Sequence, residues 1–168
     1  MNKFDTVLIS VGTTKFDPLI EVIDNRLIQE KLFQFGAKKL IVQHGSSSVP
    51  SSHIEGLIIE SFNRTNDMSP YLSQSTIMIS HAGAGCILDA REFKLPHVIV
   101  VNDSLMNNHQ KEIAEKIEKE NSAAVFYSAE KLEYAILNGT FLDKINQISD
   151  KKNPKSRSIN EVLDELFQ

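Results

Sequence analysis

The amino-acid sequence predicts an α/β fold, a Rossmann-like parallel sheet with helices on both faces. Several short, apolar, β-branched runs are typical of strands that are buried in a parallel sheet. Helix-like patterns lie between these runs, as the crossover connections of parallel strands require. The length of 168 residues fits one domain with one substantial core.

The first strand and the first helix are expected at the start of the chain. Residues 6–11 form an apolar run that stops at Gly12. Asp17 then supplies an N-cap and Pro18 a first-turn proline. A helix is expected from there to near Gly36, because apolar residues recur at helical spacing at Leu19, Ile20, Ile23, Leu27 and Ile28.

The alternation of strands and helices continues along the chain. Residues 46–52 are rich in serine and contain a proline, which predicts a loop. A helical pattern runs from about Asn108 to Lys119. Further apolar runs predict strands at residues 40–42, 57–59, 77–79 and 97–101.

The end of the chain carries a separate signal. Residues 151–157 have the composition of a polar, basic linker. Ser158 and Glu161 then form a capping-box pattern, followed by an apolar stripe of Ile159, Val162, Leu163, Leu166 and Phe167. Residues 1–150 are therefore predicted to form the domain. Residues 151–168 are predicted to be a linker and an amphipathic helix that packs either on a partner or back on the domain.

Composition excludes several classes of function. The 18 basic and 22 acidic residues give a formal net charge of -4 without blocks of like charge, which argues against a nucleic-acid partner. Cys86 is the only cysteine, so neither an internal disulfide nor a zinc site is indicated. No apolar run approaches the ~18 residues of a membrane span and no signal core opens the chain, so a cytosolic, soluble chain is expected. Without metal-ligand clusters or a G-x-S-x-G motif, we expect no metal, no cofactor and no hydrolase chemistry.

Two glycine-containing loops follow expected strands at the ends where parallel sheets bind ligands. Gly12, Thr13 and Thr14 offer a close backbone approach and two hydroxyl groups, although a plain strand-to-helix turn has the same composition. Residues 80–85, Ser-His-Ala-Gly-Ala-Gly, place small residues at a helix N-terminus, which favours a phosphate. This loop lacks the G-x-G-x-x-G spacing, so a nicotinamide enzyme is disfavoured. His81 by itself is equally consistent with a structural histidine.

Polar side chains form a third candidate cluster after the run 97–101. They lie in residues 101–110 and suit the hydroxyl groups of a sugar, and the substrate-binding candidates among them are Asn107, Asn108, His109 and Gln110. Gln110 is expected on the inward face of its helix, because it is three and four residues from Ile113 and Ala114. Asn108 is equally well explained as an N-cap. Asp89, a turn beyond the glycine loop, is either a ribose ligand or a solvated helix residue.

These residues resemble a known family. The resemblance lies in residues 11–20, in residues 41–45 and in residues 79–114, with Ile-Ser-His-Ala-Gly-Ala-Gly, Ile-Leu-Asp, Val-Asn-Asp-Ser-Leu-Met and His-Gln. Over about residues 4–126 the chain is similar to the catalytic subunit of the eukaryotic UDP-N-acetylglucosamine transferase of dolichol-linked oligosaccharide synthesis. The same motifs resemble the donor-binding domain of the bacterial peptidoglycan N-acetylglucosaminyltransferase.

The resemblance implies the C-terminal, donor-binding half of a GT-B glycosyltransferase. It implies transfer of N-acetylglucosamine from UDP-N-acetylglucosamine to N-acetylglucosaminyl-diphosphodolichol, with inversion and without a metal, as the second step of lipid-linked oligosaccharide synthesis for protein N-glycosylation. In this family a membrane-anchored subunit binds the lipid-linked acceptor and recruits the cytosolic subunit to the cytosolic face of the endoplasmic reticulum. The alternative is a non-catalytic, nucleotide-sugar-binding regulatory or scaffold protein.

The resemblance also implies roles for individual residues. It puts two loops near the diphosphate, with Gly12, Thr13, Thr14, Gly83, Ala84 and Gly85. It puts Asp89 near the ribose and Gln110 near the sugar, and the substrate-binding set also includes His81, Asn107, Asn108 and His109. Many relatives carry glutamate in place of Asp89, so the shorter carboxylate is expected to reach the ribose differently. The catalytic base is expected either on the partner or at His81.

Overall fold

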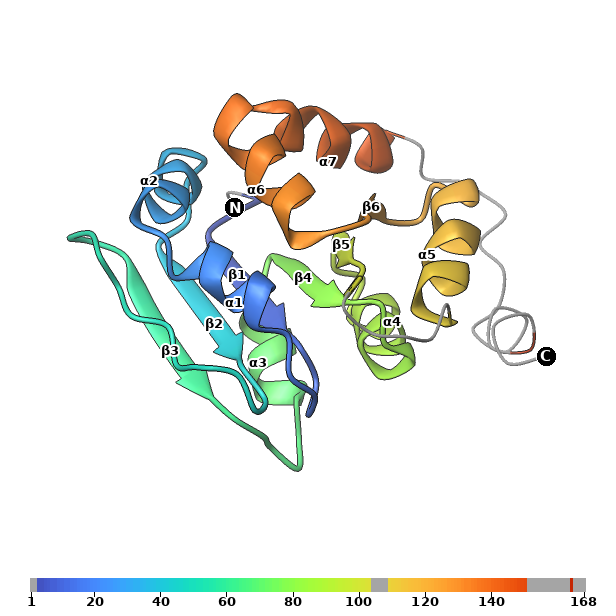
Figure 1. Cartoon of the computed structure of the whole chain (residues 1–168), viewed down its shortest axis with the longest axis horizontal. Helices are drawn as coiled ribbons and strands as arrows, with labels where there is room; N and C mark the ends of the chain where they lie inside the picture. The colour runs from blue at the N-terminus through green and yellow to red at the C-terminus, as the bar shows by residue number, and fades with distance from the viewer. Residues whose placement is uncertain (1–2, 104–108, 151–163, 165–168) are drawn as a thin grey trace.

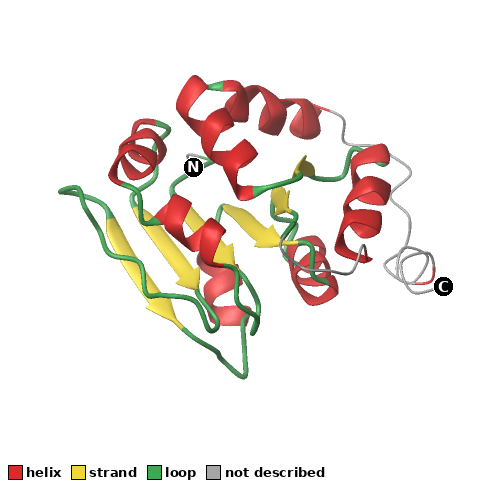
Figure 2. Ribbon diagram, in the orientation of Figure 1, coloured by secondary structure: helices red, strands yellow, loops and turns green. Residues whose placement is uncertain are grey.

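The described residues form a six-stranded parallel sheet, which confirms the predicted fold class (Figure 1 and Figure 2). The computed structural model describes residues 3–103, 109–150 and 164. All neighbouring strands are parallel, in the order β3-β2-β1-β4-β5-β6. A topological switch point therefore lies between β1 and β4, because the chain moves outward from β1 to β3 and then returns to the other side of β1. The strands are β1 (Thr6–Ser10), β2 (Lys39–Gln43), β3 (Ile58–Phe62), β4 (Ile77–His81), β5 (His97–Val100) and β6 (Ala124–Phe126).

Helices cover both faces of the sheet because strand side chains alternate between its faces. Val7 and Ile9 join a core with the first, second, sixth and seventh helices, whereas Leu8 faces the third and fourth. Ile99 and Val125 pack against the fifth helix. The helices are α1 (Asp17–Ile23), α2 (Arg26–Gln34), α3 (Ser69–Gln74), α4 (Ala84–Glu92), α5 (His109–Lys119), α6 (Ala129–Asn138) and α7 (Thr140–Asp150) (Figure 1). None of these helices is long and apolar enough to span a bilayer.

The single helix predicted from Asp17 to near Gly36 is wrong, because two helices occupy this stretch. The break comes at Asn25, whose side-chain oxygen accepts hydrogen bonds from the backbone N–H groups of Leu27 and Ile28 and so caps α2. Leu27, expected in the apolar stripe, is consequently 59% exposed. Asp17 is not an N-cap. Phe16 takes that position without a side-chain hydrogen bond, and Asp17 is the first helical residue.

Other elements differ from the prediction at their edges. The strand expected at 57–59 begins one residue later and runs to Phe62. Four elements were not predicted, namely α3, β6, α6 and α7. The ends of α6 nevertheless have readable signals, since Ser128 caps its start and Gly139 ends it in the left-handed conformation at φ +85°. The C-terminal helix expected from Ser158 lies outside the described residues apart from residue 164, so the predicted division at 150 stays a prediction.

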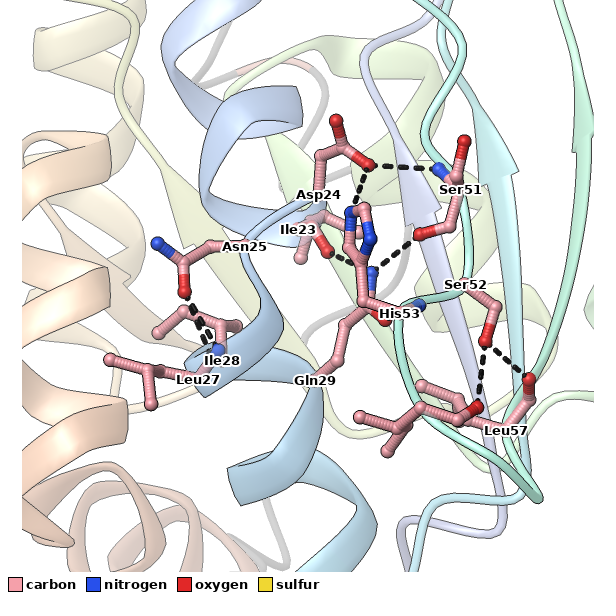
Figure 3. A network of polar contacts seen from close by, with 11 residues as sticks. Ile23, Asp24, Asn25, Leu27, Ile28, Gln29, Ser51, Ser52, His53 and Leu57 are labelled. Atoms are coloured by element: carbon pink, nitrogen blue, oxygen red, sulfur yellow. Dashed lines mark hydrogen bonds and ion pairs between the residues drawn. The ribbon is translucent and has the colours of Figure 1, made fainter.

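An irregular crossover connects β2 to β3 and is fixed by one buried glutamine (Figure 3). Gln29 of α2 has no exposed surface. Its Nε2 donates to the carbonyl oxygens of Ile23 at 3.0 Å and Ser51 at 2.8 Å, and its Oε1 accepts from the backbone N–H of His53 at 2.8 Å. Asp24 also accepts from the Ser51 N–H and pairs with the His53 ring. Side-chain hydrogen bonds therefore hold this crossover against the junction of α1 and α2.

Replacing Gln29 by leucine should lower the free energy of unfolding by about 2–4 kcal/mol, because each buried partner left unpaired costs about 1–3 kcal/mol. Urea unfolding measures this loss. The matched control is Gln34→Leu on the exposed face of the same helix, which should change stability by no more than about 0.5 kcal/mol. Equal effects of the two substitutions would show that the Gln29 hydrogen bonds do not hold the crossover.

Candidate functional site

Two predicted loops meet at the switch point between β1 and β4. Gly12 follows β1 with φ +65°, and a Cβ atom there would lie 3.0 Å from Nε2 of His81. A Cβ atom at Gly83 would lie 2.4 Å from Cε1 of the same ring. The His81 imidazole is thus in close contact with both glycines. Burial lowers the pKa of His81, which keeps the ring neutral at neutral pH.

A turn after β2 supports the loop after β1. Gly45 has φ +56°, and a Cβ atom there would lie 2.1 Å from the carbonyl oxygen of Thr14. That oxygen accepts from the Ser46 N–H at 3.2 Å. The Ser47 hydroxyl oxygen accepts from the Phe16 N–H at 2.8 Å. The close approach of these backbones fixes the conformation of residues 12–16.

The two threonines of this loop differ in what they can offer a ligand. Thr13 and Thr14 are both exposed. The Thr14 hydroxyl donates to the Val11 carbonyl oxygen at 2.8 Å, so in this arrangement its oxygen is left only to accept. The Asn102 amide donates to the Lys15 carbonyl oxygen at 3.3 Å and so ties the loop after β5 to the same place. The loops after β1, β2 and β5 therefore converge at the carboxyl ends of the strands.

The start of α4 has the properties of an anion site. Gly83 takes the N-cap position in an extended conformation, without a side-chain cap. Gly85 is exposed, and a Cβ atom there would meet no atom of the described residues within 4 Å. The first N–H groups of a helix have no intrahelical partner, and with the helix dipole they favour a negative charge. Asp89 is half-buried one turn later, and burial, with the nearby charge of Glu92, raises its pKa.

Buried polar groups lie beneath these loops, on the face of the sheet covered by α4. The Ser10 hydroxyl donates to Oε1 of Gln43 at 2.6 Å and accepts from the Gly12 N–H at 3.2 Å. The Cys86 thiol lies 3.6 Å from the same hydroxyl. Burial raises the pKa of Cys86, so it stays a thiol rather than a reactive thiolate.

A second buried pair, missed from the sequence, joins β4 to β5. Ser80 is fully buried, and its Oγ lies 2.7 Å from Nε2 of His97. The same hydroxyl donates to the carbonyl oxygen of His81 at 2.8 Å. Burial, with smaller effects of Arg91 and His81, lowers the pKa of His97 to about 3. The only sequence signal is a polar residue that opens an otherwise apolar strand.

His97 should make stability depend on pH. Its pKa is about 3 in the native chain and near 6.5 in the unfolded one, so between these values only the unfolded state binds the proton. The buried, neutral His97 makes its full contribution to the free energy of unfolding above pH 6.5. This contribution, a few kcal/mol, is lost as the pH falls toward 3. Urea unfolding of the wild type and of His97→Gln across this window should give curves that converge at low pH. Parallel curves would contradict the burial of a neutral His97.

Gln110 of the third cluster faces inward, as its helical spacing predicted. It lies in the first turn of α5, where Ile113 and Ala114 are buried. Its Oε1 atom is buried without a hydrogen-bond partner among the described residues. Such an atom is rare in native proteins, because it loses its water without a replacement. His109 is exposed, and the predicted residues Asn107 and Asn108 lie outside the described part of the chain.

The structure thus brings many of the predicted site residues to one edge of the sheet. Gly12 and Gly83 each lie against the ring of His81, and Ala84, Gly85 and Asp89 follow on α4. Their chemistry suits a phosphorylated ligand that is held by backbone N–H groups. Among the described side chains, no three of His, Cys, Asp or Glu gather in a way that could hold a metal ion.

Comparison with known proteins gives the same family as the resemblance seen in the sequence. The profile of the glycosyltransferase family 28 C-terminal domain matches residues 6–166. A protein of Yarrowia lipolytica named UDP-N-acetylglucosamine transferase subunit ALG13 is 38% identical over 124 residues, which are 70% of this chain and 63% of that protein. The human protein of the same name is 34% identical over 116 residues, which are 68% of this chain and 10% of that protein. This chain therefore spans less than two thirds of these relatives.

Solved structures share the fold. The NMR solution structure of ALG13 has a TM-score of 0.67 at 24% identity, and the match covers 96% of this chain and 94% of that one. The crystal structure of Acinetobacter baumannii MurG has a TM-score of 0.60 at 18% identity, and the match covers 96% of this chain and 49% of that one. The resemblance stated from the sequence is confirmed, and this chain belongs to the glycosyltransferase family 28 C-terminal domain family.

Proposed function

We propose that this chain is the donor-binding, catalytic subunit of a heteromeric, inverting glycosyltransferase. Its reaction is the transfer of N-acetylglucosamine from UDP-N-acetylglucosamine to N-acetylglucosaminyl-diphosphodolichol. The observation that carries the proposal is the meeting of the two glycine loops at the switch point, beside the uncapped start of α4. Relatives named UDP-N-acetylglucosamine transferase subunit ALG13 support the choice of sugar nucleotide.

We assign groups at this edge of the sheet to the diphosphate, the ribose and the sugar of the donor. The N–H groups at the start of α4 suit the diphosphate and would stabilise the charge that develops on the leaving UDP. We assign the ribose hydroxyls to the carboxyl group of Asp89, which is half-buried one turn beyond the start of α4 and can accept their hydrogen bonds. The Oε1 of Gln110 has no hydrogen-bond partner among the described residues, and it suits a hydroxyl or amide N–H of the sugar.

The acceptor hydroxyl must lose a proton during inversion. His81 is neutral and can accept one, although its lowered pKa makes it a weaker base than an exposed histidine. A base on the partner is the other source, since we propose that the partner binds the acceptor. We propose that the partner is a membrane-anchored, acceptor-binding subunit at the cytosolic face of the endoplasmic reticulum, and that residues 151–168 dock on it.

A transfer assay tests the proposed function. The chain is incubated with UDP-N-acetylglucosamine and the lipid-diphosphate acceptor, with and without the membrane subunit. Product is expected only when both subunits are present. Donor binding without product under any condition would favour the non-catalytic binding protein, and a chain that does not bind the donor would contradict both readings.

Replacing Gln110 by alanine should lower transfer by about tenfold or more, because a lost hydrogen bond of about 1.4 kcal/mol corresponds to a factor of about 10. The stability of the free chain should not fall, since Oε1 has no hydrogen-bond partner to lose among the described residues. Steady-state kinetics and urea unfolding measure the two effects. The control is Lys111→Ala at the exposed neighbouring position, which should change neither. Parallel losses of activity and stability in Gln110→Ala would indicate a role in the core instead.

A further inference from the structure

The pair of His97 and Ser80 is buried under α4 and does not belong to the ligand-facing groups of the proposed site. His97 opens β5 and is 5% exposed, and Ser80 is the next-to-last residue of β4 with no exposed surface. A histidine and a serine in an otherwise apolar sheet interior are costly unless they hydrogen-bond. Their hydrogen bonds end at the backbone of the loop at residues 80–85, and not at a side chain on the surface.

The direction of the hydrogen bonds follows from the number of protons. Serine has one hydroxyl proton, and Ser80 donates it to the carbonyl oxygen of His81 at 2.8 Å. The contact of 2.7 Å between Ser80 Oγ and His97 Nε2 then needs its proton from the ring. His97 is therefore the tautomer that carries the proton on Nε2. The Nε2–H of His97 therefore donates to the Ser80 hydroxyl oxygen, and the Ser80 hydroxyl donates to the carbonyl oxygen of His81.

We infer that His97 and Ser80 are positioning residues, which hold the peptide after His81 and thereby set the geometry of the phosphate-binding loop. This inference rests on the proposed function of that loop. The carbonyl oxygen of His81 and the N–H of Ala82 belong to one planar trans peptide and point in opposite directions. Fixing the oxygen therefore also fixes the N–H that opens the loop.

The His81 ring also lies against the loop after β1, at Gly12. The ring would be 3.0 Å from a Cβ atom at Gly12 and 2.4 Å from one at Gly83, so it has little room on either side. A shift of the His81 backbone would therefore press the ring against one of the two loops. The hydrogen bond from Ser80 holds the His81 carbonyl group and so opposes such a shift.

Two matched pairs of variants separate the hydrogen bonds from packing. Ser80→Thr keeps the hydroxyl group and adds a methyl group, and Ser80→Val adds the same methyl group but has a second methyl group in place of the hydroxyl. His97→Gln keeps an N–H donor near the position of Nε2, and His97→Leu removes it. We expect Ser80→Val and His97→Leu to lower kcat/KM about 10- to 100-fold with the membrane subunit, since small misplacements at a site have effects of this size. Ser80→Thr and His97→Gln should retain most of the activity.

A stability control shows that the losses do not come from general weakening of the fold. Ile136→Val removes one buried methyl group from α6 on the opposite face of the sheet and should cost about 1 kcal/mol. It should leave UDP-N-acetylglucosamine affinity and kcat/KM unchanged. Ser80→Val and His97→Leu should instead weaken the binding of UDP measured by calorimetry. If they lose no more affinity than Ile136→Val, or if the donor-keeping variants are not better than their partners, the inference is wrong.

Nitrogen-15 NMR of the wild-type chain tests the same inference without any variant. The His97 ring should carry its proton on Nε2, and this proton should stay in place when UDP is added. A ring protonated only on Nδ1 would overturn the inference, because Ser80 would then have to donate to His97 and not to His81. Failure of the wild type to bind UDP would instead contradict the proposed function and leave this tautomer measurement valid by itself.

Discussion

Replacing Gly45 by alanine should lower the free energy of unfolding by about 3–4 kcal/mol, a large effect for one methyl group. The new Cβ atom would lie 2.1 Å from the carbonyl oxygen of Thr14, and backbone atoms cannot rotate away as a side chain can. Alanine at φ +56° adds a further cost of about 1–2 kcal/mol. Donor binding should fall as well, because the loop after β1 must move to relieve the overlap. Urea unfolding and calorimetry with UDP-N-acetylglucosamine measure the two losses.

Gly139→Ala is the matched control for Gly45→Ala. Gly139 also has a left-handed backbone, with φ +85°, but in the described part of the chain a Cβ atom there would meet nothing within 4 Å. This variant should pay only the conformational cost of about 1–2 kcal/mol and should bind the donor like the wild type. Similar losses in the two variants would show that the contact between Gly45 and Thr14 does not support the loop.

Replacing Gly83 by alanine should weaken the binding of UDP-N-acetylglucosamine by about 10- to 100-fold, at the level expected for a small displacement within a site. The new Cβ atom would lie 2.4 Å from Cε1 and 2.5 Å from Nε2 of His81, so the ring must leave its place. A side chain can move more cheaply than a backbone. The loss of stability should therefore be smaller than in Gly45→Ala. Calorimetry gives the affinity, and urea unfolding gives the stability.

A double-mutant cycle identifies the cause of the Gly83→Ala effect. The substitution is repeated in a His81→Ala background, where no ring remains to be displaced. Gly83→Ala should then cost much less affinity than it does in the wild type. An unchanged cost in both backgrounds would mean that the overlap with His81 is not the reason.

The main strands were predictable because their signal is local. Four apolar runs became β1, β2, β4 and β5, since a buried parallel strand is apolar on both faces. The break at Asn25 was not predicted, because the apolar spacing continues across it and only the side-chain hydrogen bonds of Asn25 reveal it. β6 has three residues, too few for a pattern to be recognised.

Most contacts within the site could not be predicted, because they depend on the order and register of the strands and not on local sequence patterns. Gln110 was correctly predicted to face inward, because helical spacing alone determines that. The pairing of His97 with Ser80 depends on the register of β4 against β5, in which Met78 lies opposite His97. The contact of Gly45 with Thr14 likewise depends on β2 lying beside β1. Residues of this kind can be recognised only after the strand order is known.

Chemical-shift mapping of the nitrogen-15-labelled chain during titration with UDP-N-acetylglucosamine tests the proposed donor site most directly. The largest changes should appear at the backbone N–H groups of residues 12–14, of residues 82–89 and of Gln110. UDP-glucose should shift the first two groups in the same way and Gln110 less. Changes confined to other parts of the sheet, such as β3, or no changes at all, would contradict a UDP-sugar site between β1 and β4.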